Sequence, residues 1–196
     1  SGVEIVNDAW QNIIGTKALP NRISSNGGPG VSVATGTGNT IRYNSIYTNG
    51  GLGVDLKRDG ETLNHPNTVD TSWEPNELLN YPVITYVDFS GLRTHVVGYY
   101  HGKASAAFDL DFYSNSAADN TLGDGQMWLG ETHVTTDADG FAIFDLNLAV
   151  SPASWVDAFP TAAATNAAGS TSEFTHDADL DGLADSWELL GIPIAG

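Results

Sequence analysis

The first 56 residues contain an internal repeat, and it limits the folds open to this chain more than any other feature. Residues 21–33 align with residues 44–56 at a constant offset of 23 residues. Asn, Ile, Asn, three Gly and Val recur at equal positions of the two copies. Residues 2–15 read as an earlier copy that is lengthened near residues 16–20. Self-similarity with a period of about 20 to 50 residues is typical of stacked repeat architectures.

Each copy of the repeat contains short runs with the alternation of β-strands. Val31 and Val33 are expected to point inward and Ser32 outward, and Ile41 and Ile46 mark two further short strands. Gly and Asn occupy the corners, where both tolerate left-handed backbone, and stacked Asn side chains can form ladders. Leucine-rich repeats have a similar period but need far more Leu. We therefore predict that residues 1–56 form the last coils of a right-handed parallel β-helix.

Residues 57–80 form a polar connector in which Pro and Asn prevent a helix or a central strand. Two or three coils are too few to be stable alone, so their open end needs a cover. We expect the connector to cap the coils, anchored by Trp73, Leu78 and Leu79.

Residues 81–175 change to alternating apolar and polar runs at regular spacing. Phe108, Leu110 and Phe112 alternate with Asp109 and Asp111, which indicates one buried and one solvated face. Seven such runs predict an immunoglobulin-like or fibronectin-like β-sandwich, with Pro160 on an edge strand or at a bulge and a turn at residues 137–140. The predicted strands are Val83–Phe89, His95–His101, Ala106–Tyr113, Gln126–Thr136, Phe141–Leu148, Val156–Thr165 and Ser172–Phe174.

Two stretches resemble known secreted proteins. Residues 27–56, with Gly38-Asn39-Thr40-Ile41 and Gly51-Leu52-Gly53-Val54, resemble the last coils of bacterial β-helix proteins of the pectate-lyase-like repeat group. Residues 75–83, 123–130, 135–140 and 171–174 resemble the sandwich module that often follows those coils. The resemblance implies a secreted or cell-surface bacterial protein, and it implies that the sandwich is a non-catalytic spacer or binding unit.

Enzymes of that group carry Asp, Lys or Arg on one face of several successive coils. Here the charged coil residues share no column of the repeat, so no active-site row carries over. Elsewhere Asp109 and Asp111 are expected to be solvated, and the five His lack the spacing of zinc ligands. We therefore predict that the chain is not an enzyme. The charged coil residues considered are Glu4, Lys17, Arg22, Arg42 and Asp55.

Residues 176–196 contain the most specific motif of the chain, a calcium-loop pattern over residues 177–188. Oxygen-bearing side chains at loop positions 1, 3, 5, 9 and 12, with Gly182 at position 6, match an EF-hand-like loop followed by the start of a helix. The loop resembles those of dockerins and thrombospondin type 3 repeats. Dockerins pair two loops and this chain has one, so cohesin binding is not expected. The predicted ligands for Ca²⁺ are Asp177, Asp179, Asp181, Leu183 through its carbonyl, Asp185 and Glu188.

Charge excludes several partners. The chain has 24 Asp and Glu against 7 Lys and Arg, for a net charge of −17, so nucleic acid and anionic membranes are repelled while calcium is attracted. No apolar stretch is long enough to insert into a membrane, and no signal peptide is visible. With no Cys, the fold has no disulfide bonds. Both ends of the sequence read as cut from a longer protein.

These features leave three functional classes. The first is a calcium-binding structural or adhesive module of a secreted or surface protein. The second is the ancillary carbohydrate-binding end of a β-helix polysaccharide lyase or hydrolase, for which exposed aromatic rings would supply a sugar platform. The third is a self-assembling subunit of an extracellular filament or layer. The candidate platform residues are Tyr99, Tyr100, Trp128 and Trp155.

Overall fold

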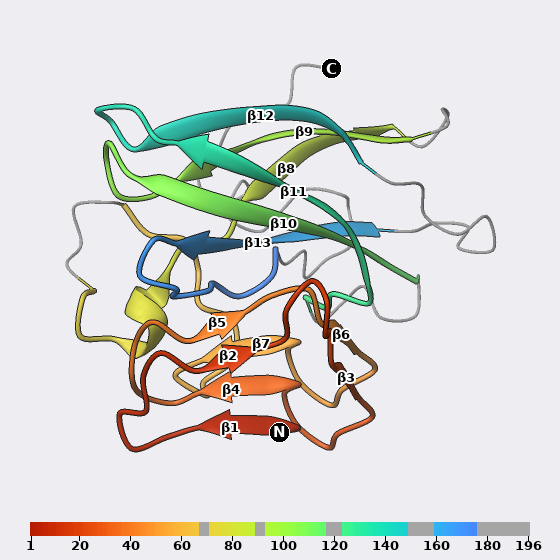
Figure 1. Ribbon diagram of the computed structural model, residues 1–196, viewed down its shortest axis with the longest axis vertical. Helices are drawn as coiled ribbons and strands as arrows, with labels where there is room; N and C mark the ends of the chain where they lie inside the picture. The colour runs from red at the N-terminus through yellow and green to blue at the C-terminus, as the bar shows by residue number, and fades with distance from the viewer. Residues whose placement is uncertain (67–70, 89–92, 117–122, 149–158, 176–196) are drawn as a thin grey trace.

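The computed structural model describes residues 1–66, 71–88, 93–116, 123–148 and 159–175. Within these ranges the protein is all-β, with strands β1 to β13 and one short 3-10 turn, η1. Parallel strands form one end of the molecule and antiparallel strands form the other (Figure 1). No helix in these ranges is long and apolar enough to cross a membrane.

The first 56 residues form three small parallel sheets, ordered β1-β4-β7, β2-β5 and β3-β6 (Figure 1). Each strand therefore pairs with its counterpart in the next copy of the repeat and not with its neighbour in sequence. The strands are β1 (Val3–Ile5), β2 (Ile13–Ile14), β3 (Arg22–Ser24), β4 (Val31–Val33), β5 (Thr40–Ile41), β6 (Ser45–Tyr47) and β7 (Val54–Leu56).

The pairing register agrees with the repeat. Ile23 lies opposite Ile46, an offset of 23 residues, whereas Ile13 lies opposite Thr40, an offset of 27. Val3 lies opposite Val31, an offset of 28, so one of the five additional residues of the earlier copy lies between β1 and β2. The other four lie between β2 and β3, where residues 16–20 were predicted to lengthen that copy. Buried side chains at Ile5, Val31 and Val54 and at related positions fill the space between the sheets.

Asparagines at the corners form three ladders. In each, the backbone N–H and the side-chain amide of one Asn donate to Oδ1 of the Asn in the next copy, at 2.8 to 3.2 Å. The second Asn donates back to a carbonyl of the preceding copy. The corner backbone is thus hydrogen-bonded where no strand pairing exists. The pairs are Asn12 and Asn39, Asn21 and Asn44, and Asn26 and Asn49.

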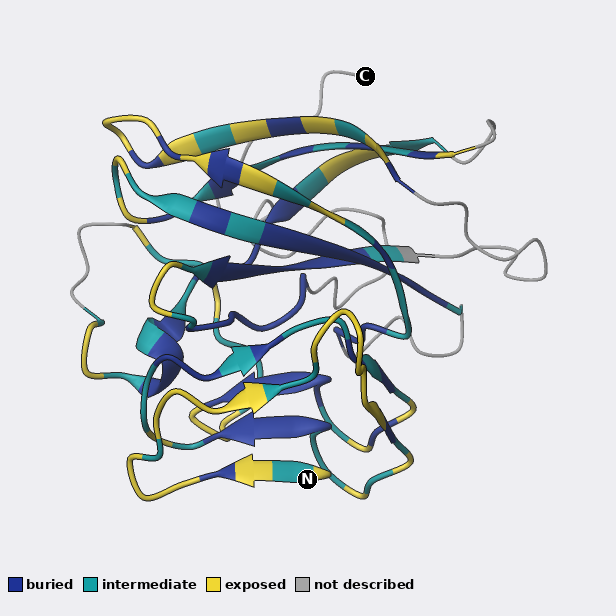
Figure 2. Cartoon of the chain, viewed as in Figure 1, coloured by how far each residue is buried: buried dark blue, intermediate teal, exposed yellow. Residues whose placement is uncertain are grey.

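The remaining strands form two antiparallel sheets, ordered β12-β9-β8 and β11-β10-β13. Their facing sides enclose a second core that includes Val96, Tyr100, Phe112 and Phe144 (Figure 2). The strands are β8 (Val83–Asp88), β9 (Thr94–His101), β10 (Ala107–Asn115), β11 (Met127–Thr135), β12 (Phe141–Leu148) and β13 (Phe159–Asn166).

The five runs predicted between Val83 and Leu148 match β8 to β12 to within two residues. Pro160 lies in the edge strand β13, as its missing N–H requires. The turn predicted at residues 137–140 is confirmed, and it joins β11 to β12, which belong to different sheets. One expectation was wrong, because Ser172–Phe174 is not a strand.

The ladders predict that replacing an asparagine lowers the free energy of unfolding by an amount that depends on its position in the ladder. Asn44 is buried, and Asn44→Ala removes the acceptor of two Asn21 donors and one of the two donors to the carbonyl of Ile14, which keeps the N–H of Arg42. We expect a loss of about 2 to 3 kcal/mol in the free energy of unfolding, measured by urea denaturation. Asn21→Ala is the matched control, because Asn21 is exposed, and it should cost less than about 1 kcal/mol. Equal losses in the two variants would contradict a structural ladder.

Candidate functional site

The predicted calcium ligands, residues 177–188, lie outside the described residues, as does Trp155. The structure does describe the chain that leads into the loop. Residues 171–175 are all buried, and Thr175 lies two positions before Asp177. The contacts of this segment therefore determine how the start of the loop is held.

On one side, this segment closes the edge of the last coil. The Thr171 hydroxyl accepts the N–H of Ile41 in β5 at 3.0 Å. The carboxylate of Glu173 accepts the N–H of Leu56 in β7 and the N–H of Thr62, both at 2.8 Å. These side chains thus accept hydrogen bonds from backbone N–H groups that would otherwise be free to pair with a further parallel strand.

On its other side, the same segment bonds to the antiparallel sheets. The N–H groups of Ser172 and Thr175 donate to the carbonyls of Ala164 and Ala162 in β13, at 2.9 and 2.8 Å. The hydroxyl of Thr175 also donates to the carbonyl of Pro82 at 2.7 Å. The chain that enters the predicted loop is consequently fixed to both halves of the molecule.

Asn76, in η1 (Pro75–Leu78), is the second element that closes the coils. Its side chain is fully buried, accepts the N–H of Asn39 and donates to the carbonyls of Asn39 and Thr171, at 2.8 to 3.0 Å. Leu78 is buried in the coil core, whereas Trp73 is 69% exposed and anchors nothing. The expectation for Trp73 was wrong because the open coil end presents backbone donors and acceptors, which an amide satisfies and an indole ring does not.

Glu173 is electrostatically unusual. Burial raises the pKa of its carboxyl to about 7, although the N–H groups of Thr62 and Leu56 oppose the rise, and the charge of Asp55 adds to it. Burial also raises the pKa of Asp55, against the N–H groups of Gly60 and its neighbours. No group of three His, Cys, Asp or Glu in the described ranges could hold a metal ion.

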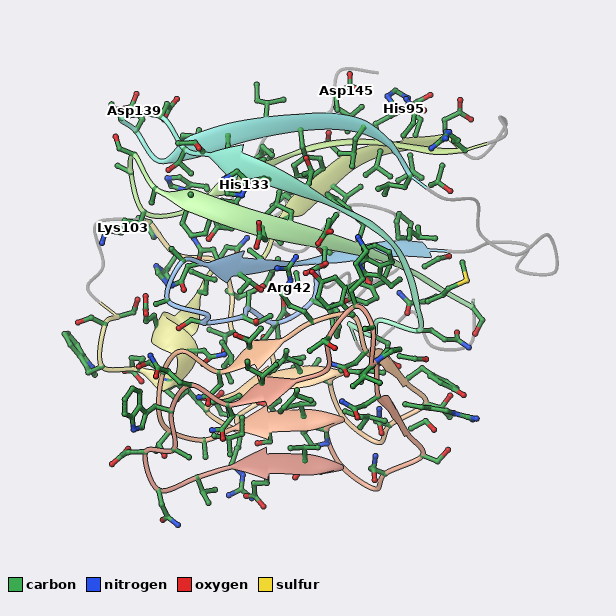
Figure 3. The ribbon with its side chains drawn as sticks, viewed as in Figure 1. Arg42, His95, Lys103, His133, Asp139 and Asp145 are labelled. Atoms are coloured by element: carbon green, nitrogen blue, oxygen red, sulfur yellow. The ribbon has the colours of Figure 1, made fainter. Side chains whose placement is uncertain are left out.

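A charged network joins the coils to the outer face of β10 and β11 (Figure 3). The guanidinium of Arg42 binds Asp109 at 2.7 Å, Glu131 at 2.9 Å and, through Nε, Asp111. Asp111 also accepts the indole N–H of Trp128 at 3.0 Å. Burial alone would lower the pKa of Arg42, but the hydrogen bond and charge of Asp111 outweigh it and raise that pKa, so the guanidinium stays charged.

The network corrects the prediction that Asp111 is solvated, whereas the side chain of Asp109 remains 43% exposed. Asp111 is buried because the coils cover this part of the sheet. Its partner Arg42 is 69 residues away in sequence, and no local pattern connects the two. The only sequence signal was the charge of Arg42 in a coil that otherwise carries few charges.

The predicted aromatic platform does not form as expected. Tyr100 is fully buried against Phe108, with ring centroids 4.5 Å apart, so it has no face to offer. Trp128 is half-buried, and the ammonium of Lys17 lies 4.9 Å from its ring centre. Tyr99 lies on the other sheet, on the outer face of β9, half-buried beside Phe141. The described candidates therefore do not share one surface.

No protein-family model matches the chain. The functional interpretation therefore depends on the calcium-loop pattern and on the segment that anchors its start.

The network predicts a large effect of Arg42→Met. The substitution leaves three acidic side chains facing one another, two of them wholly or partly buried. We expect a loss of about 3 to 5 kcal/mol in urea denaturation. Arg22→Met is the control, since Arg22 is exposed and stacks only on Tyr47, and it should cost less than about 1 kcal/mol. An Arg42→Met loss no larger than that of Arg22→Met would contradict an energetic role for the network.

Glu173 predicts a pH dependence with a definite sign. Its pKa rises from an ordinary 4.5 to about 7, so the folded protein binds more protons than the unfolded chain between these values. The free energy of unfolding should therefore fall as pH rises through this window, by at most about 3 kcal/mol. Glu173→Gln should flatten the profile, measured by urea denaturation from pH 4 to pH 8 (roughly the window and its margins). Glu4→Gln, at an exposed position, should leave the profile unchanged, and an unchanged profile in Glu173→Gln would contradict the assignment.

Proposed function

We propose that this chain is a calcium-stabilised, non-catalytic module of a secreted or cell-surface protein. Its parallel strands are the end of a right-handed β-helix, and its antiparallel sheets form an immunoglobulin-like sandwich. The observation that carries the proposal is the anchoring of residues 171–175 to both halves, directly before the calcium-loop pattern. A cation held by that loop stabilises the folded chain at the point where coils and sandwich meet.

The finer fold assignment is supported by three features. The pairs β3–β6 and β4–β7 have the repeat offset of 23 residues, two of the three Asn ladders span the same 23 residues, and the two antiparallel sheets share one core. A β-helix end and an immunoglobulin-like sandwich are the simplest architectures that combine them.

A non-catalytic role agrees with the partners of cations in the coils and the start of the connector. Arg42 and Lys17, from the coils, bind acidic residues of the sandwich, Lys17 at 2.9 Å from Glu131. Arg58 and Lys57, from the connector, pair with Glu4 at 2.7 Å and with Glu74 at 3.5 Å. These charges therefore serve contacts within the chain. They do not form a row that faces a substrate.

The location follows from calcium chemistry. Calcium loops of extracellular modules have dissociation constants of roughly 10⁻⁴ to 10⁻³ M, so roughly millimolar extracellular calcium fills them. The net charge of −17 raises the affinity for a divalent cation and makes the calcium-free chain less stable through self-repulsion. Both effects favour a protein that folds and works outside the cell.

Calcium titration tests the proposal. Because calcium binds the native state alone, a concentration of tens of times Kd should add about 2 kcal/mol of stability and raise Tm by about 5 °C. Calorimetry should give one site per chain. Asp181→Ala and Glu188→Gln should abolish both signals, whereas Asp8→Asn, an exposed acid far from the loop in sequence, should retain them.

Two results would overturn the proposal. One is the absence of binding heat and of any Tm shift with calcium. The other is a shift that persists in Asp181→Ala and Glu188→Gln, which would assign calcium to the diffuse negative charge of the chain.

A further inference from the structure

The outer face of the β12-β9-β8 sheet carries large apolar side chains that the described chain does not cover. Alternation along β12 turns Phe144 inward, while Phe141 and Ile143 remain 45% and 80% exposed. Tyr86, from β8, is 53% exposed. Figure 2 shows exposed and buried positions alternating along β12. Exposed aromatic side chains gathered on one sheet face are typical of a binding surface.

The strand register gathers the aromatic side chains of this face. Phe141 lies opposite His101 and stacks on it, with ring centroids 4.1 Å apart and planes inclined by 7°. Tyr99, the next outward residue of β9, has its ring 6.2 Å from Phe141. Tyr86 meets His95 edge-on at 5.8 Å, farther along the same face. The rings thus form a strip along β9.

Polar groups border this strip. His95 Nε2 lies 2.8 Å from Asp145 Oδ1, and Figure 3 shows the two side chains together at one end of the sheet. Asn147 lies opposite His95 in the register. The outward positions of β9 and β12 contain neither Lys nor Arg. The face therefore offers apolar rings and hydrogen-bonding groups with no fixed positive charge.

We propose that this face binds the chain of a neutral polysaccharide, with the rings of Tyr86 and Phe141 packing on sugar faces and His95, Asp145 and Asn147 bonding hydroxyls. A pyranose presents apolar C–H groups on its faces and hydroxyls at its edge, which matches rings bordered by polar groups. Tyr86 and Phe141 lie on strands on opposite sides of β9, opposite Val97 and His101, so an extended chain that crosses β9 meets the two rings with different sugars. The charge of −17 opposes anionic polymers, whereas a neutral polymer meets no such repulsion.

This site differs from the platform expected from sequence. It excludes the buried Tyr100 and the covered Trp128, and it is independent of the proposed calcium loop. Trp10 and Trp73 are also exposed, at 67% and 69%, but they lie in loops outside these strands. They therefore provide controls for non-specific aromatic binding.

Native affinity electrophoresis with the full chain tests the proposal. The gels contain hydroxyethylcellulose, galactomannan or soluble starch as neutral polymers, and polygalacturonate as the anionic polymer. At least one neutral polymer should retard the native protein. Tyr86→Ala and Phe141→Ala should each weaken the apparent affinity at least ~10-fold. Their Tm values should stay close to the native one because the two side chains, at 53% and 45% exposure, lie on the solvent side of the sheet and outside the core. Trp73→Ala, the matched exposed aromatic, should bind as the native protein does.

Several results would overturn the proposal. These are no retardation by any neutral polymer, retardation by polygalacturonate alone, or a loss in Trp73→Ala equal to that in Phe141→Ala. Sedimentation velocity provides a further decisive outcome. If native protein self-associates, Phe141→Ala does not, and neutral polymers leave migration unchanged, the face is a contact between two copies of this chain.

Discussion

A stack of parallel strands ends in unpaired backbone donors and acceptors, and how this end is closed determines much of the structure. Buried N–H and C=O groups need partners, and an open edge invites pairing with another chain. Here the partners are side chains, namely those of Thr171, Glu173 and Asn76. They come from the connector before the antiparallel sheets and from the segment after them. The capped end therefore exists only when the rest of the chain is folded.

The same requirement explains why charged groups are buried where coils and sheets meet. Arg42 extends from the coils to Asp109, Asp111 and Glu131 of the antiparallel sheet. In the other direction, Tyr113 and Phe174, which follow the coils in sequence, pack into the apolar core of the coils. Burying carboxylates is costly unless they are paired and hydrogen-bonded. Among the described residues Glu173 has N–H donors but no cationic partner, and its raised pKa reflects the resulting cost of burying its charge. The coils and the sheets consequently share both an apolar core and a set of compensated charges, and we expect them to unfold together.

The period of a repeat and the alternation of strands are local patterns, so the register of the coils, the Asn ladders and strands β8 to β12 could be predicted from sequence. Burial that depends on distant partners could not. Asp and Tyr often lie at protein surfaces, and Asp111 and Tyr100 are buried here only because other elements pack over them. Residues 172–174 alternate like a strand, yet their side chains and amides serve as caps. For the calcium site, sequence predicts the ligands, whereas the anchoring of Thr175 just before them was found only in the structure.

The central claim is that the segment from Thr171 to Thr175 couples the predicted calcium loop to the end of the coils. Hydrogen exchange of the amides of Ile41, Leu56 and Thr62 measures this most directly, because each donates to a side chain of that segment. Our account predicts that these amides exchange more slowly when calcium is added, and that Asp181→Ala removes the difference. Equal exchange rates with and without calcium, in a protein that binds it, would contradict the coupling.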